Sequence, residues 1–274
     1  MRPILMVEHL SVSFSRYGRG LSRTRLHALR DLSLTVEPGQ VAAVVGESGA
    51  GKSLLAHAIL HILPRNAQSK GTILYDGAPL TPDRAAALRG REISLIPQGV
   101  TYLDPMMTVG AQLCRGRTDS ETRARCRQVL ERYGLGPETE TLYPFQLSGG
   151  MARRVLIACA VMDSPRLIVA DEPTPGLDAK AAERVLGHFR ELAQAGAGVL
   201  FITHDLKLAL SVADRLAVFR EGRTVDEVSA ANFRQGEGFA HPYTRALWQA
   251  MPEHDFLQGR ISSARRPQSG NTRG

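Results

Sequence analysis

Apolar residues are distributed in two different ways along the chain, and each predicts strands. Residues 4–14 and 26–36 alternate apolar and polar side chains, which predicts two strands joined by a polar loop rich in Gly and Arg. Continuous apolar runs occupy residues 40–46, 166–171 and 198–203. Such runs are typical of parallel strands that are buried on both faces.

Helical periodicity fills the segments between these strands. It predicts helices over residues 52–63, ending at Pro64, and over residues 179–195 and 205–213. Shorter strands are predicted in "GTILYDG" and "EISLIPQ", and on both sides of the turn "REGR". The alternation of strand and helix indicates an α/β fold with a largely parallel sheet.

The order of the elements also predicts a domain organisation. The pattern is mostly helical from about residue 99 to 163, which is interpreted as an insertion into a domain of residues 1–235. Residues 236–274 are expected to form an extension. Within it, a helix at about 241–251 precedes a polar, basic tail that is expected to be disordered.

Composition narrows the class of protein. The 274 residues, 43% of them apolar, are sufficient for one large domain or two small ones. The longest apolar runs reach about eight residues, far short of the ~20 that a membrane span needs. The N-terminus lacks the apolar stretch of a signal peptide. A cytosolic protein is therefore expected, with any membrane role peripheral.

Charge and cysteine usage add two expectations. The net charge is +7, and arginine supplies 30 of the 34 cationic side chains because only four lysines are present. Basic proteins often bind nucleic acids or anionic membranes. Here the arginines are scattered, apart from one loop and the tail, and no aromatic residues interleave them, so no nucleic-acid partner is expected. Cys114, Cys126 and Cys159 lack metal-type spacing and are interpreted as reduced thiols.

The sequence "GESGAGKS" lies between the first continuous apolar run and a helical stretch. It matches the pattern G-x-x-x-x-G-K-[ST], whose glycines let backbone N–H groups turn toward phosphate oxygens at a helix N-terminus. The lysine would reach the β- and γ-phosphates, and the serine hydroxyl would bind Mg²⁺. The alternative is a glycine-rich turn before an ordinary helix. The predicted nucleotide-binding residues of this loop are Gly46, Glu47, Ser48, Gly49, Ala50, Gly51, Lys52, Ser53 and Leu54.

Polar residues end three of the other predicted strands. "LIVADEP" ends in Asp171, placed to hold Mg²⁺ through water, and Glu172, placed to polarise an attacking water as a general base. His204 follows "FIT", where it can orient that water, and Gln98 ends "LIPQ", where it can ligate Mg²⁺. Taken alone, the two acidic residues could equally be a solvated pair at a strand end. A lone histidine normally has a structural role. Beside a phosphate loop they predict a catalytic site with Mg²⁺ held by Ser53, Gln98 and Asp171.

A second glycine-rich turn, "LSGGM", lies far downstream of the first. It can present Ser148 and the N–H groups of Gly149 and Gly150 at the start of a helix near Met151, which predicts a second anion-binding terminus. Residues 46–53 already cover the phosphates of this chain's own nucleotide. The second turn is therefore predicted to close over the γ-phosphate of a nucleotide held by a facing chain. Binding of ATP would then join two subunits, and hydrolysis would release them.

In order and spacing, these motifs resemble those of the ATP-binding cassette (ABC) ATPases. The resemblance covers about residues 4–230 and includes "LSGGM", "LIVADEP" and Asp178 of "GLD", which it places among the nucleotide-binding residues. It implies a P-loop NTPase core of the RecA-like type, which binds ATP and Mg²⁺. It also implies that the N-terminal strands form an antiparallel β subdomain and that the segment at about 99–163 is a helical subdomain.

Two further points concern single residues. The family implies an aromatic residue that stacks on adenine, which is Phe14 by register, with Tyr17 as the alternative. The sequence departs from the common family pattern at Met151, where many cassettes have Gln, and at Pro175 and Gly176, where small helix-compatible residues are more usual. These departures leave the predicted catalytic groups in place.

Finer features resemble the ATPases of bacterial peptide and nickel importers, notably "TYLDPMMTVGAQL" and the C-terminal "HPYTRALWQAMP". This resemblance implies an ATPase at the cytoplasmic face of the inner membrane that drives two transmembrane permease subunits. A second, related ATPase would complete a heterodimer, with a homodimer as the alternative, and an external solute-binding protein would take part indirectly. Some relatives carry a cysteine cluster near this end. No Cys follows Cys159, so no iron–sulfur cluster is expected.

The apolar residues of "GVTYLDPMMTVGAQL" suggest how such an ATPase would contact a permease. Tyr102, Leu103, Met106 and Met107 are predicted to line a groove for a short permease helix, with local packing as the alternative.

Two other classes of function fit these motifs less well than transport does. A soluble cassette ATPase acting on ribosomes or DNA usually has two cassettes or a long coiled coil, and a P-loop kinase or GTPase would have no use for "LSGGM". His57 and His61 have a spacing that can bind metal on a helix, but they are interpreted as core or interface residues.

Overall fold

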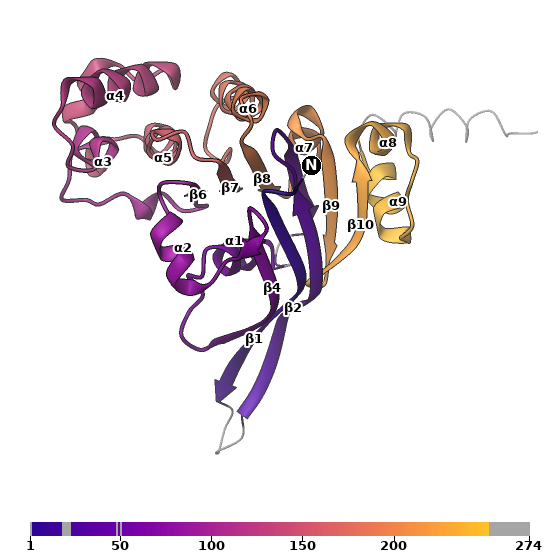
Figure 1. The fold of residues 1–274 in the computed structure, drawn as a ribbon. Helices are drawn as coiled ribbons and strands as arrows, with labels where there is room; N and C mark the ends of the chain where they lie inside the picture. The colour runs from indigo at the N-terminus through magenta and orange to yellow at the C-terminus, as the bar shows by residue number, and fades with distance from the viewer. Residues whose placement is uncertain (1, 18–22, 48, 50, 252–274) are drawn as a thin grey trace, which may run out of the picture.

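The computed structural model describes residues 2–17, 23–47, 49 and 51–251, which form two β-sheets and several helices (Figure 1). The smaller sheet is antiparallel and has the order β2-β1-β4-β5. The larger sheet has the order β10-β9-β3-β8-β7-β6, and its strands from β9 to β6 are parallel. The strands are β1 Leu5–Tyr17, β2 Arg23–Val36, β3 Val41–Gly46, β4 Ala67–Tyr75, β5 Ala78–Pro79, β6 Ile93–Ile96, β7 Leu167–Asp171, β8 Gly198–Thr203, β9 Arg215–Arg220 and β10 Arg223–Ser229.

The helices gather in distinct places around the sheets. In Figure 1, α3 and α4 lie at the opposite side of the molecule from α8 and α9, and the smaller sheet extends away from both groups. The α-helices are α1 Lys52–Ile59, α2 Pro82–Leu88, α3 Val109–Cys114, α4 Ser120–Arg132, α5 Gly149–Val161, α6 Ala179–Gln194, α7 Leu206–Val212, α8 Ala230–Gln235 and α9 Pro242–Gln249. Within the described residues, no helix is long and apolar enough to cross a bilayer.

The larger sheet is buried on both faces, which explains the continuous apolar runs. On β3, Val41, Ala43 and Val45 belong to one apolar cluster, whereas Ala42 and Val44 belong to another. The first cluster includes residues of α5, α6 and α7, and the second includes residues of α1 and of the antiparallel sheet. Because successive side chains on a strand point to opposite faces, both clusters require apolar residues at consecutive positions.

The predicted α/β fold with a largely parallel sheet is confirmed. The segment predicted as mostly helical contains α3, α4 and α5, with one 3₁₀ turn before α3 and two between α4 and α5. One boundary was wrong, since α1 ends at Ile59 and not just before Pro64. His61 has a φ of 51° and its ring lies against the Leu80 carbonyl, so the chain leaves the helix before the proline. His57 and His61 therefore do not share a helix, which removes the basis for a metal pair with helical spacing.

Candidate functional site

The phosphate loop begins where β3 ends against β9. Gly46 pairs with Phe219, and a Cβ at Gly46 would lie 2.2 Å from the Phe219 carbonyl oxygen, so only glycine fits. Lys52 is the first residue of α1 and folds back over the loop. Its Nζ donates to the carbonyl oxygens of Gly46 at 2.7 Å and Glu47 at 2.8 Å. The loop thus holds a cation at a helix N-terminus, where an anion is bound most favourably.

The electrostatics of Lys52 suit a phosphate ligand. Only 7% of the residue is exposed, and this burial lowers the pKa of its ammonium group, while the charges of Glu172 and Asp171 oppose the change. The electrostatic attraction between a cation and an anionic ligand is stronger when the cation is buried than when it is exposed to water. Bound phosphate would supply the negative charge that burial leaves uncompensated.

Asp171 ends β7 and offers a carboxylate oxygen without a partner. The residue is 3% exposed, and its Oδ1 is buried with no hydrogen-bond partner among the residues that the structure describes. Burial raises the pKa of Asp171, while the Ser53 hydroxyl, His57 and Lys52 oppose the rise. An unpartnered buried carboxylate oxygen is costly unless a cation or donor meets it. The position fits a Mg²⁺ ion, which prefers oxygen ligands and completes its shell with water and substrate phosphates.

Glu172 is held in place by the residues that follow β8. Its Oε1 accepts a hydrogen bond from the backbone N–H of His204 at 3.0 Å and lies 2.7 Å from His204 Nδ1. Its Oε2 has only a long contact, 3.4 Å, with the Thr203 hydroxyl. Glu172 also has a φ of 47°, an uncommon conformation for a residue with a side chain. The geometry fixes the carboxylate while leaving one oxygen able to accept a proton.

Three of the predicted groups share one cavity of about 300 Å³. The phosphate loop, the end of β7 and Gln98, two residues beyond β6, each contribute to it. The cavity is lined by Gly49, Gly51, Lys52, Ser53, Leu54, Gln98, Asp171 and Glu172. This arrangement can hold a nucleotide phosphate chain, a divalent cation and an attacking water.

"LSGGM" lies outside this cavity. Ser148 is the N-cap of α5, and its hydroxyl accepts a hydrogen bond from the Met151 N–H at 3.3 Å. Ser148 and Gly149 are exposed, and a Cβ at Gly149 would meet nothing within 4 Å. The turn is therefore open to a ligand from outside this chain.

The other predicted site residues occupy separate positions. Asp178 is the N-cap of α6 and accepts a hydrogen bond from Ala181 N–H at 2.8 Å. Phe14 lies on β1 and packs partly buried against the second apolar cluster. Neither lines the cavity, so their contacts with nucleotide remain predictions. Ser48 and Ala50 lie outside the described residues, as does the side chain of Tyr17.

One residue of the site was not predicted from the sequence. Arg153 of α5 is 6% exposed, and its guanidinium donates to the carbonyl oxygens of Pro97, at 2.7 Å, and Gln98. Burial lowers the pKa of Arg153, with Asp171 and Glu172 opposing. The signal available in the sequence was an arginine within a largely apolar helical stretch. Arg153 connects the helix that begins at Ser148 with the backbone of Gln98.

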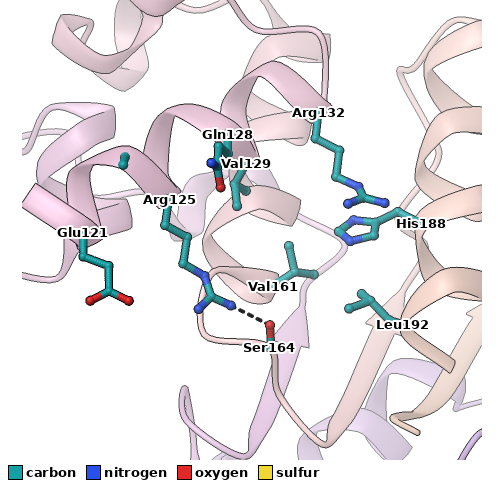
Figure 2. A pocket seen from close by; sticks show the side chains of 10 residues that line it. Glu121, Arg125, Gln128, Val129, Arg132, Val161, Ser164, His188 and Leu192 are labelled. Carbon is teal, nitrogen blue, oxygen red and sulfur yellow. Dashed lines mark hydrogen bonds between the residues drawn. The ribbon is translucent and has the colours of Figure 1, made fainter. Parts of the chain in front are cut away.

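A second cavity of about 460 Å³ lies between α4, α5 and α6 (Figure 2). His188 is buried at its edge, and its Nδ1 contacts the Tyr133 hydroxyl. Burial lowers the pKa of His188 to about 4, so the ring is neutral near pH 7. Arg125, which belongs to α4, donates to the Ser164 hydroxyl at 2.6 Å. The cavity contains none of the predicted site residues, and its histidine is structural.

The phosphate loop, the carboxylate pair and the parallel sheet define the class of P-loop nucleotide hydrolases. Residues 29–175 match the family described as ABC transporter. The chain is 36% identical over 268 residues to the oligopeptide transport ATP-binding protein OppD of Lactococcus lactis subsp. cremoris (strain SK11), covering 93% of this chain and 77% of the relative. The chain belongs to the ABC transporter family, and it is an ATPase of the cassette type.

Other relatives and structures agree with this assignment. The chain is 38% identical over 268 residues to the peptidoglycan transport ATP-binding protein YejF of Agrobacterium fabrum (strain C58 / ATCC 33970), covering 92% of this chain but 48% of that protein. A dimeric ATP-binding cassette in a post-hydrolysis state, bound to ADP and Pi, superposes with a TM-score of 0.73 at 25% identity, covering 86% of this chain and 100% of that one. The predicted family and ATPase activity are confirmed.

Proposed function

We propose that this chain is the ATP-hydrolysing subunit of a bacterial importer and that it powers the uptake of peptides. The observation that carries the proposal is the cavity in which Lys52, the unpartnered Oδ1 of Asp171 and the fixed carboxylate of Glu172 meet. Hydrolysis of a nucleoside triphosphate requires three groups: a cation that binds the phosphates, a ligand for Mg²⁺ and a general base.

The roles of the residues follow from their positions. Ser53, Gln98 and Asp171 would hold Mg²⁺, which supplies positive charge to the phosphate oxygens. Lys52 and the N-terminus of α1 neutralise the β- and γ-phosphates. Glu172 Oε2 accepts a proton from the water that attacks the γ-phosphorus, as the bond to the β–γ bridging oxygen breaks and ADP leaves.

His204 supports this step in two ways. Its backbone N–H and its Nδ1 hold Glu172 Oε1, which leaves Oε2 facing the water. Its side chain is 56% exposed, so the ring is also free to contact a γ-phosphate. We assign His204 as the group that orients Glu172 and the water.

A second ATPase subunit would complete each site. Ser148, Gly149 and Gly150 lie outside this chain's cavity, and Ser148 and Gly149 are exposed, as a contact with a facing nucleotide requires. Asp178 would lie in the same interface. The partner is proposed to be a related but distinct ATPase, with a second copy of this chain as the alternative.

The transport role defines the remaining partners and the location. Two permease subunits would bind this chain at the cytoplasmic face of the inner membrane, and an external binding protein would deliver the solute. The names of the similar proteins mention oligopeptide transport, peptidoglycan transport and glutathione import. Peptides and peptide-containing molecules share this chemistry, whereas nothing in these names supports nickel.

The catalytic assignment is tested by Glu172→Gln in the purified chain. Turnover should fall by about 100-fold or more, since the base is lost, while ATP binding persists because the phosphate contacts remain. Glu183→Gln, an exposed position on α6, is the matched control and should behave as wild type. Wild-type turnover in Glu172→Gln would show that Glu172 is not the base.

The assignment of "LSGGM" to the facing site is tested by Ser148→Arg. The isolated variant should bind ATP normally but, in mixed subunits, should inactivate the site whose phosphate loop belongs to the partner. Thr81→Arg is the control, because Thr81 is also an exposed N-cap whose hydroxyl accepts an N–H at 3.3 Å. A loss of ATP affinity as severe as that of Lys52→Ala would place "LSGGM" in this chain's own pocket.

A further inference from the structure

A polar cavity of about 630 Å³ lies at the amino ends of two strands of the parallel sheet. Arg91 comes shortly before β6 and Arg166 directly before β7, and both residues line the cavity. The nucleotide cavity is at the carboxyl ends of the strands, where Asp171 ends β7. The residues of β7 between the two span roughly 16 Å, so the cavities are separate sites.

Arginine dominates the lining of this second polar cavity, which we call the arginine cavity. Four guanidinium groups and two carboxylates give the lining a net charge of +2. Every lining residue among those that the structure describes is polar or charged, and a cleft lined mainly by one sign of charge concentrates counter-ions. These lining residues are Arg91, Glu92, Arg115, Arg117, Asp163, Ser164 and Arg166.

Arg115 is held in place by contacts within the protein. It ends α3 with a φ of 50°, and its guanidinium donates to the carbonyl oxygens of Gly90 and, at 3.1 Å, of Cys159. Gly90 has a φ of 74°, and a Cβ there would lie 3.3 Å from the Arg115 guanidinium, so glycine makes room for this contact. A guanidinium that is already fixed loses less conformational entropy when it binds an anion than a mobile one does.

Asp163 compensates only part of the charge in the cavity. Its two carboxylate oxygens pair with different residues, Arg115 at 3.0 Å and Arg117 at 2.7 Å. One carboxylate thus serves two guanidinium groups, each of which has five N–H donors. Both arginines therefore keep N–H groups that can donate to an anion.

The charges next to the lining leave this balance unchanged. Asp76, outside the lining, pairs with Arg166 at 3.0 Å. Arg125 of α4 donates to the Ser164 hydroxyl at 2.6 Å and so adds one guanidinium for the one carboxylate (Figure 2). Within the described part of the chain, the exposed Arg91 side chain has neither an ion pair nor a hydrogen bond, which leaves its guanidinium available to a ligand.

We infer that the arginine cavity binds a phosphate monoester, carried either by a small molecule or by a lipid headgroup. Such a group has close to two negative charges at pH 7 and three terminal oxygens that accept hydrogen bonds, which matches the net charge of +2 in the lining. Its oxygens point in different directions and can meet guanidinium groups from three segments of the chain, whereas a carboxylate offers two oxygens in one plane. This site and the proposed ATP site stand independently of each other.

The test is a calorimetric titration of glycerol 3-phosphate into the full chain carrying Lys52→Ala, which removes the cation of the phosphate loop. In a phosphate-free buffer of about 0.1 M ionic strength, a Kd below about 1 mM is expected. Adding Arg91→Gln should raise this Kd about five- to tenfold, because one guanidinium is lost. Its stability in urea should be unchanged, because Arg91 makes no side-chain contact that the substitution could break.

The matched control is Arg65→Gln, since Arg65 is also exposed and lies outside the arginine cavity. It should leave the Kd within about twofold of the parent, because distant charges are screened at this ionic strength.

Vesicles distinguish the two sources of the phosphate group. Phosphatidylcholine vesicles that contain phosphatidic acid present a phosphate monoester at a membrane surface. Binding to these vesicles alone, weakened by Arg91→Gln, would assign the site to a lipid headgroup. Binding of glycerol 3-phosphate alone, weakened in the same way, would assign it to a soluble ester, and either result supports the site.

Several outcomes would overturn the phosphate site. The first is that neither probe binds, and the second is that Arg65→Gln weakens binding as much as Arg91→Gln does. A third is that succinate, a dicarboxylate, binds as tightly as glycerol 3-phosphate. Binding that is present in the wild type and lost in Lys52→Ala would place the anion at the phosphate loop instead. A wild-type chain that failed to bind Mg–ATP would contradict the proposed function and leave the result for the arginine cavity unaffected.

Discussion

Arg153→Met tests the connection between α5 and Gln98. The substitution keeps an apolar stem of similar length and removes two guanidinium hydrogen bonds, to the Pro97 and Gln98 carbonyls. Bonds that involve a charged donor contribute about 1.5–3 kcal/mol each, so the loss is about 3–6 kcal/mol. Removing a buried cation recovers part of this, since Arg153 Nε has no partner and burial lowers the arginine pKa. The expected net loss of unfolding free energy is about 2–4 kcal/mol.

Urea unfolding and steady-state ATPase assays check both consequences. Turnover should fall more than ATP affinity does, because Gln98 loses its backbone support while Lys52 keeps its contacts. Arg89→Met is a matched control, since Arg89 also donates to two consecutive carbonyls, Leu60 at 2.8 Å and His61 at 3.5 Å, outside the nucleotide cavity. It should lose stability but not turnover at saturating ATP. Unchanged stability and turnover in Arg153→Met would refute the reasoning.

Three further substitutions have defined outcomes. Lys52→Ala should raise the Kd for ATP by about 100-fold or more, measured by equilibrium binding, and retained affinity would contradict the site. The unfolding free energy of the wild type should fall by about 3 kcal/mol as pH drops from 6.5 to about 4. In this range His188 takes up a proton in the unfolded state, whereas burial keeps its ring neutral in the folded state. His188→Gln should lack this component in urea titrations; an identical pH profile would show that His188 does not cause it. Met106→Glu, at a side chain that is 82% exposed, should leave ATP affinity unchanged and abolish solute uptake in reconstituted vesicles, whereas unfolding would refute the proposed permease contact.

The sequence predicted the parts of the site that follow strands of the parallel sheet. Lys52, Asp171, Glu172 and Gln98 each lie at the end of an apolar strand or shortly beyond it, and parallel strands bring their carboxyl ends to one edge. His204 contacts Glu172 for the same reason, because it follows β8, the neighbour of β7 in the sheet. These positions could be predicted because short, local patterns identify both the buried strands and the polar residues at their ends.

Other features depend on contacts between distant segments, which no local pattern encodes. Arg153 could be read as a charged residue in an apolar helix, but not as the donor to residues more than fifty positions earlier. The end of α1 at Ile59 was missed because apolar residues continue to Leu63 while the backbone turns at His61.

The position of β3 in the sheet has a consequence for protein synthesis. β3 precedes the phosphate loop, but its neighbours are β8 and β9, and Val41 N–H donates to the Asp214 carboxylate at 2.8 Å. A chain emerging from the ribosome therefore exposes its phosphate loop long before the strands that shape it exist. Nascent fragments that end before residue 220 should not bind ATP, so ATP cannot guide the early folding of this protein. Any ribosome-bound chaperone would meet β3 as an unpaired, wholly apolar strand.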